Sequence, residues 1–157
     1  MRRIFAVLGL VAMTAAGAFL FILLAMRSKS PGMLRTVRRF NREVTNKVQI
    51  KNAGAPGAYA SVIRHRGRKT GKEYETPIVP FPTDDAFLIS LPYGPDTDWC
   101  RNILAAGTAT LVTEGETYAV AQPEIVATAD VQHLFPANEQ RTHRVFRVEH
   151  CLRMQRV

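Results

Sequence analysis

RHRGRKTGKEYETPI, residues 64–78, is the most informative segment of this sequence, because it predicts a basic hairpin. It carries five arginine and lysine residues and two glycines, between apolar runs at Tyr59–Ile63 and Thr76–Phe81. Those runs contain β-branched residues, so the segment predicts two strands joined by a loop. Glycine lets a backbone approach an anion closely, and arginine offers a planar fork of donors that matches phosphate oxygens. The loop predicts either a site for a phosphate or carboxylate tail or an ordinary solvated turn.

A strand and a short helix follow downstream, between Leu88 and Gly107. The strand Leu88–Leu91 ends in a turn rich in proline and glycine, and a polar residue at 96–98 can cap the helix that follows. Gly107 can end this helix. Helical spacing puts Trp99 and Asn102 on one face. A helix N-terminus beside a basic loop would add backbone N–H donors to an anion site.

Together, these segments resemble the deazaflavin-dependent nitroreductase family. The matching pieces are GRKTG at 67–71, TPI at 76–78, Ser90, and Trp99 followed three residues later by Asn102. The resemblance covers residues 59–126 and continues weakly to the end of the chain. It implies a mainly β fold, a split β-barrel similar to that of the flavin-nucleotide oxidoreductases with short helices, which binds coenzyme F420. FMN is the alternative cofactor on a similar barrel.

The resemblance also implies a set of cofactor-binding residues. The basic loop would hold the phosphate or polyglutamate tail, the second hairpin strand would line the ring and linker, and the third strand and the helix would complete the pocket. The residues implied are Arg68, Lys69, Thr70, Tyr74, Thr76, Pro77, Ile78, Val79, Leu88, Ile89, Ser90, Leu91, Asp98, Trp99, Cys100, Arg101 and Asn102. Trp99 has a second interpretation as a core anchor.

The chain departs from the family in two places. Residues 92–96, PYGPD, stand where members often carry two glycines and a lysine, and no tyrosine follows Tyr118 to assist protonation. His133, His143 or His150 could donate a proton instead, or could be ordinary surface or core histidines. The sequence therefore assigns no catalytic residue.

Composition limits the classes of protein that fit. A chain of 157 residues with 46% hydrophobic residues can bury one core. A net charge of +8 suits nucleic acid, an anionic membrane surface or a polyanionic coenzyme. Nucleic acid fits poorly, because no aromatic residues alternate with the cations. Cys100 and Cys151 are too few for a metal site, and no cluster has zinc-ligand spacing.

The N-terminus carries an apolar run, residues 4–26, without a charged residue. Its length predicts one transmembrane helix. The flank that follows is more basic than the one before, so the chain is expected to cross the cell inner membrane once with its C-terminal domain in the cytoplasm. The alternatives are a cleaved signal peptide or a true start further downstream.

The sequence divides into three predicted regions: an anchor at 1–32, a basic amphipathic helix at 33–51 and the barrel domain at 52–157. The amphipathic helix could lie on membrane lipids or pack on the barrel. Further strands are expected at Ala86–Leu91, Thr108–Thr113, Thr117–Gln122 with a continuation over Glu124–Thr128, and Val145–Met154, and a short helix at Asp130–Phe135.

Two functions from different classes are compatible with these features. The first is a membrane-tethered oxidoreductase that transfers a hydride from reduced F420 to a lipophilic small-molecule acceptor, such as a quinone or a nitro compound. The second is a non-catalytic module that binds F420, FMN or a membrane partner. Split barrels of this type commonly dimerise, so a homodimer is compatible with either function.

Overall fold

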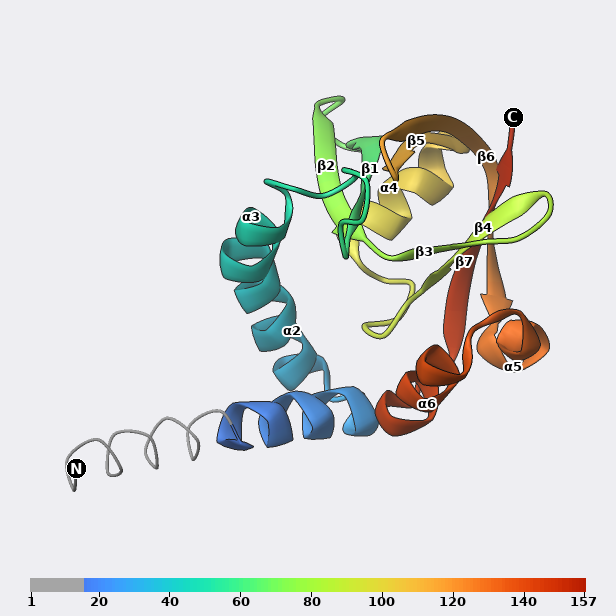
Figure 1. Ribbon diagram of the computed structural model, residues 1–157. Helices are drawn as coiled ribbons and strands as arrows, with labels where there is room; N and C mark the ends of the chain where they lie inside the picture. The colour runs from blue at the N-terminus through green and yellow to red at the C-terminus, as the bar shows by residue number, and fades with distance from the viewer. Residues whose placement is uncertain (1–15) are drawn as a thin grey trace, which may run out of the picture.

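Residues 16–157 are described by a computed structural model, and seven antiparallel strands form the body of this part of the chain (Figure 1). The strands run in the order β2-β1-β5-β6-β7-β4-β3 across one sheet. Their bounds are β1 Ser61–Arg66, β2 Glu73–Ile78, β3 Pro80–Pro82, β4 Ala86–Ser90, β5 Thr108–Thr113, β6 Glu116–Ala127 and β7 His150–Arg156.

The connection between β2 and β3 makes the sheet curl. These two strands lie at opposite edges of the sheet, yet only Val79 separates Ile78 at the end of β2 from Pro80 at the start of β3. A single residue spans less than 4 Å, or roughly the Cα spacing of a peptide, so the two edges must approach each other. The resulting curled antiparallel sheet matches the predicted split barrel.

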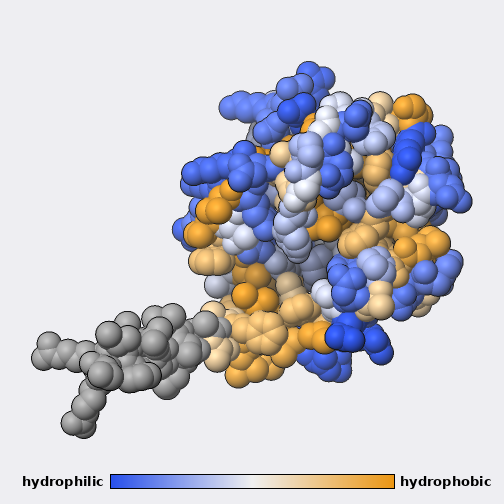
Figure 2. Space-filling model, viewed as in Figure 1, coloured by the Kyte–Doolittle hydropathy of each residue, from blue (hydrophilic) through white to orange (hydrophobic). Residues whose placement is uncertain are grey.

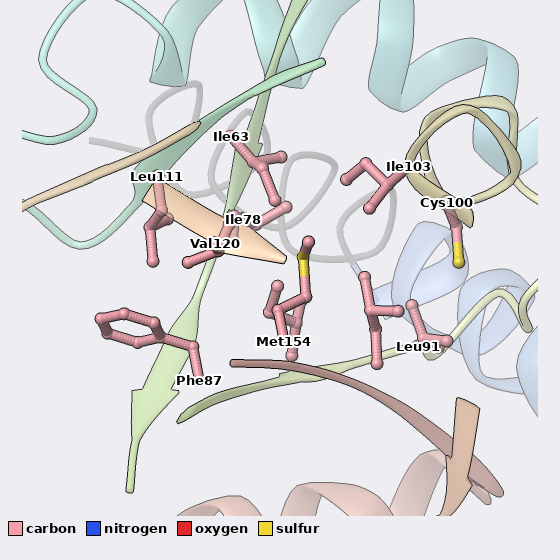
Figure 3. Packing of buried hydrophobic residues seen from close by; sticks show 11 residues of the cluster. Ile63, Ile78, Phe87, Leu91, Cys100, Ile103, Leu111, Val120 and Met154 are labelled. Atoms are coloured by element: carbon pink, nitrogen blue, oxygen red, sulfur yellow. The ribbon is translucent and has the colours of Figure 1, made fainter. Parts of the chain in front are cut away.

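The core lies inside the curl, where α4 (Asp98–Ala106) closes it (Figure 3). Ile103 and Cys100 of this helix are fully buried beside Met154 of β7 and Ile63 of β1. Gly107 ends the helix in the left-handed region, at φ 74°, and its N–H donates to the carbonyl of Ile103. The helix that holds the predicted site is thus anchored by its apolar face.

The amphipathic segment forms one continuous helix beside the barrel (Figure 1). It consists of α2 (Pro31–Phe40), a π-helical turn (Asn41–Thr45) and α3 (Asn46–Gln49), and we call residues 31–49 the basic helix. A π-helical turn inserts one residue into the helical ladder and is often found at functional sites.

The C-terminal region differs from the prediction. Val145 and Phe146, expected to begin the last strand, belong to a helix, α6 (Ala137–Phe146). Arg147 ends this helix in the left-handed conformation, at φ 51°, without the glycine that usually marks such a position. The predicted helix at Asp130–Phe135 corresponds to α5 (Thr128–Val131) and a 3-10 turn (Gln132–Leu134).

The N-terminal prediction needs correction. Within residues 16–157, no helix is both long enough and apolar enough to cross a bilayer. The predicted transmembrane helix, and the single-pass inner-membrane location derived from it, are therefore wrong for this part of the chain; residues 4–15 of the predicted span lie outside the described residues. Residues 16–28 form a helix whose end docks on the C-terminal part of α6: the guanidinium of Arg27 donates to the carbonyl of Val145, at 3.0 Å.

Candidate functional site

A pocket of about 690 Å³ opens between the basic helix, the β1–β2 hairpin and the start of α4. Its volume lies within the range of about 300–1,000 Å³ that is usual for small-molecule sites. The lining combines aromatic and apolar groups, including Tyr74, Pro77, Tyr93, Trp99 and Ile50, with several cations. Hydrophilic residues gather on the surface where α3 and the hairpin lie (Figure 2). The pocket can therefore accept a flat ring together with an anionic group.

Asn102 connects the basic loop to the barrel. It is buried on α4, and its Oδ1 accepts hydrogen bonds from the backbone N–H of Arg68, at 3.2 Å, and from the Arg68 guanidinium, at 2.8 Å. The same guanidinium forms a 3.1 Å ion pair with the exposed carboxylate of Asp98. Arg68 is therefore held against α4 at the pocket rim.

The Arg68 contacts also determine the protonation state of His65. Because arginine can only donate, Oδ1 of Asn102 must face Arg68, and its Nδ2 must face Nδ1 of His65, at 3.3 Å. An amide N–H donates, so Nδ1 accepts and the imidazole proton sits on Nε2, which donates to the hydroxyl of Thr76 at 3.1 Å. Burial lowers the pKa of His65, in agreement with this neutral form. The Thr76 hydroxyl keeps its own proton available as a donor.

Gly67, the first glycine of the basic loop, is required by packing. A Cβ there would lie 2.6 Å from the Thr70 hydroxyl and 2.7 Å from the Tyr74 ring. The Tyr74 ring stacks on His65 at a centroid distance of 5.9 Å, and its hydroxyl lies 3.2 Å from that of Thr70. The absence of a side chain at Gly67 thus lets the loop fold onto the aromatic edge of the pocket.

The opposite side of the pocket was not predicted as part of the site. The basic helix lines it with Arg38, Asn41, Arg42, Asn46 and Lys47. The sequence alone predicts that the helix carrying these residues lies on membrane lipids or packs on the barrel. The signal that could have found them is their spacing: Arg38, Asn41, Arg42 and Asn46 recur at intervals of three or four residues and therefore share one face of a helix.

Tyr93 joins the basic helix to the loop before α4. Arg38 donates to its carbonyl, and Asn41 donates to its hydroxyl. Burial raises the pKa of Tyr93, opposed by the hydrogen bond from Asn41 and the charge of Arg38. Two buried polar atoms beside it, Nε of Arg38 and Oγ1 of Thr97, have no partner among the described residues. Both residues line the pocket, so a polar ligand there could satisfy them.

The structure brings nine of the seventeen sequence-predicted site residues to this pocket. These are Arg68, Lys69, Thr70, Tyr74, Thr76, Pro77, Asp98, Trp99 and Asn102. Trp99 also packs against the core, so its two interpretations are compatible.

The other eight predicted residues, including Ser90, are not among those that line the pocket. Ile78, Leu88, Ile89, Leu91 and Cys100 are buried in the core, Val79 lies in the link between β2 and β3, and Arg101 pairs with Asp96 on the surface, at 2.6 Å. The sequence resemblance places them near the cofactor, but the structure does not bring them to the pocket.

Ser90 belongs to a separate polar cluster under α6. Its hydroxyl lies 2.8 Å from Nε2 of His143, whose Nδ1 contacts the side chain of Gln132 at 3.2 Å. Burial lowers the pKa of His143, and the neighbouring Glu139 opposes this shift. Of the three histidines proposed as proton donors, neither this one nor His133 or His150 lines the pocket.

Comparison with known proteins supports the fold. No protein-family model and no curated protein matches the sequence. The fold is similar to that of a protein solved as a domain-swapped dimer, with a TM-score of 0.50 and 12% identity over 80% of this chain and 100% of the other. At this identity the likeness shows the fold alone.

Two further structures are similar at lower scores. One is an F420-H2 dependent reductase (FDR-A), with a TM-score of 0.46 and 13% identity over 62% of this chain and 94% of the other. The second is a protein of the pyridoxinephosphate oxidase family from Clostridium acetobutylicum, related to general stress protein 26 of B. subtilis. It has a TM-score of 0.47 and 12% identity over 75% of this chain and 84% of the other.

Proposed function

We propose that the protein is an F420-dependent reductase that transfers a hydride from reduced F420 to a lipophilic acceptor such as a quinone or a nitro compound. The observation that carries the proposal is the meeting of the GRKTG loop, the Thr76-Pro77 strand and the Trp99–Asn102 helix around one pocket. The loop and the strand belong to one hairpin, whereas the helix comes from a separate part of the chain, and all three are pieces that resemble the deazaflavin-dependent family.

The residues present fit such a coenzyme. Lys69 and Arg68 offer charge-assisted donors to a phosphate or carboxylate at the rim, whereas Trp99, Tyr74 and Pro77 offer flat or apolar surfaces for a ring. The unpartnered Nε of Arg38 adds a further donor. Hydride transfer is the chemistry that the coenzyme would supply when bound.

The protein's own part is to orient the ligands and to provide a proton. Reduction of a quinone or a nitro group by hydride also consumes protons, and the pocket hydroxyls of Thr76, Tyr93 and Thr97 each have a proton free to donate, since Oγ1 of Thr97 has no partner among the described residues. Thr76 accepts from His65, and Tyr93 accepts from Asn41, so in each case the hydroxyl hydrogen is not used in that contact. We assign the proton-donating role to Tyr93, because it lines the pocket and its phenol is a stronger acid than the alcohol of a threonine.

The test is the oxidation of chemically reduced F420 by the purified chain with menadione or a nitroaromatic compound as acceptor. Turnover with either acceptor, reduced at least about tenfold in Tyr93→Phe, is the expected result. Binding of F420 without any turnover would favour the second candidate function, a non-catalytic F420-binding module. Tight binding of FMN in place of F420 would make the protein a flavin-binding member of the same fold.

We extend the proposal to a homodimer, since one protein of similar fold is a domain-swapped dimer. Light scattering coupled to size-exclusion chromatography would measure the molar mass in solution. A mass of twice the 17.5 kDa chain is expected, and a mass of one chain would contradict this part of the proposal.

A further inference from the structure

The pocket carries cations on two facing elements, and these cations differ in how they are neutralised. The three carboxylates that line it, Glu75, Asp96 and Asp98, each form an ion pair, with Arg64, Arg101 and Arg68 respectively. They therefore do little to neutralise the remaining cations of the pocket.

Four lining cations remain without a carboxylate partner among residues 16–157. Lys69 lies on the basic loop, whereas Arg38, Arg42 and Lys47 lie on the basic helix. Like charges that face one cavity repel each other, and a bound anion would relieve this repulsion. The helix contribution is larger than that of the loop, although only the loop carries the anion-binding motif.

The basic helix is held by its hydrogen bonds to Tyr93 at the pocket and by only a small apolar contact. Leu34 and Val37 are its buried apolar residues, near its start, whereas its later apolar residues, Val44 and Val48, are exposed. At its middle, the hydrogen bond from Asn41 to the Tyr93 hydroxyl occurs where the π-helical turn begins. The turn therefore coincides with the point at which the helix meets the pocket.

We infer that Arg42 and Lys47 of the basic helix form a second binding site for the anionic tail, which extends the site of the basic loop across the pocket. The inference rests on the proposed function and specifies the ligand further: an elongated polyanion with several carboxylates, such as an oligoglutamate tail, instead of a ligand with one compact phosphate. A single phosphate can neutralise one group of cations, whereas a chain of carboxylates can contact the loop and the helix together.

The experiment compares ligands that share the ring but differ in the tail. Binding of F420 with a long glutamate tail, and of its tail-less chromophore without phosphate or glutamates, is measured by fluorescence titration. The proteins are the wild-type chain, Arg42→Ala/Lys47→Ala, and a control, Arg35→Ala/Arg39→Ala. The control removes the same charge from the same helix at exposed positions that do not line the pocket.

The inference predicts that Arg42→Ala/Lys47→Ala weakens binding of F420 about tenfold, leaves binding of the tail-less chromophore within about twofold, and flattens the salt dependence of F420 binding. The control variant should bind both ligands as the wild type does. A tail-only probe, oligo-γ-glutamate, should compete with F420 for the wild type but less well for Arg42→Ala/Lys47→Ala.

Two outcomes would overturn the inference. Equal F420 affinity for the wild type and Arg42→Ala/Lys47→Ala would show that the helix does not contact the tail, while the proposed function would stand. Equal losses in the pocket variant and the control would show a general charge effect. Failure of the wild type to bind either ligand would instead overturn the proposed function, and the two failures are therefore distinguishable.

Discussion

Replacement of Asn102 by alanine should destabilise the protein more than its position on a short helix would suggest. The substitution removes two hydrogen bonds to Arg68 and one to His65. Arg68 is exposed, so water can replace both of its hydrogen bonds and their loss costs about 1 kcal/mol, whereas Nδ1 of the buried His65 keeps no partner and costs about 1–3 kcal/mol. The expected loss is about 2–4 kcal/mol, a large part of the roughly 5–15 kcal/mol that stabilises a small domain.

Urea denaturation followed by circular dichroism measures this loss, and Asn46→Ala is the matched control. Asn46 is also helical and lines the same pocket, but no side-chain hydrogen bond of Asn46 occurs among the described residues. Alanine favours a helix equally at both positions, so this gain cancels in the comparison. A free energy of unfolding for Asn102→Ala within about 0.5 kcal/mol of that for Asn46→Ala would refute the role of the Arg68–Asn102–His65 chain.

Three further predictions follow from packing and burial. Gly67→Ala should lower the free energy of unfolding by about 1 kcal/mol, because its Cβ would lie 2.6 Å from a hydroxyl, whereas Gly32→Ala, with open space around it, should not destabilise the chain. Burial lowers the pKa of His65 and His143, so below about pH 6.5 the unfolded chain binds more protons than the native protein. The free energy of unfolding should therefore fall as the pH drops below about 6.5, and it should fall less in a variant with glutamine at both positions. Burial raises the pKa of Cys100 to about 11, so Ellman's reagent should label it at pH 8 only when urea unfolds the protein; rapid labelling of the native state would contradict its burial.

Local patterns predicted much of the barrel. The hairpin around the basic loop, the strand at Thr108–Thr113 and the helix that ends at Gly107 all occur, because each is specified by nearby residues: alternating apolar positions, turn glycines and a left-handed cap. The close approach of β2 and β3 depends on the single residue Val79, which becomes informative only when the strand order is known.

Long-range contacts account for what the sequence could not predict. Ser90 lies at the end of a strand, as expected, but α6 packs over it and pairs it with His143. Pro136 precedes α6, but no glycine or proline marks its C-terminal end at Arg147. The basic helix has an amphipathic pattern that suits a surface or a partner equally well. Its hydrogen bonds to Tyr93 and the side chains that it contributes to the lining show that it faces the pocket.

The proposed function requires that the basic loop and the pocket beside it bind the anionic tail of F420. Fluorescence titration of F420 against the wild type and Arg68→Ala/Lys69→Ala tests it most directly, with circular dichroism to verify that both proteins are folded. We expect saturable binding to the wild type and an affinity at least about tenfold lower for the double variant. Equal binding to both proteins, or no saturable binding to the wild type, would contradict it.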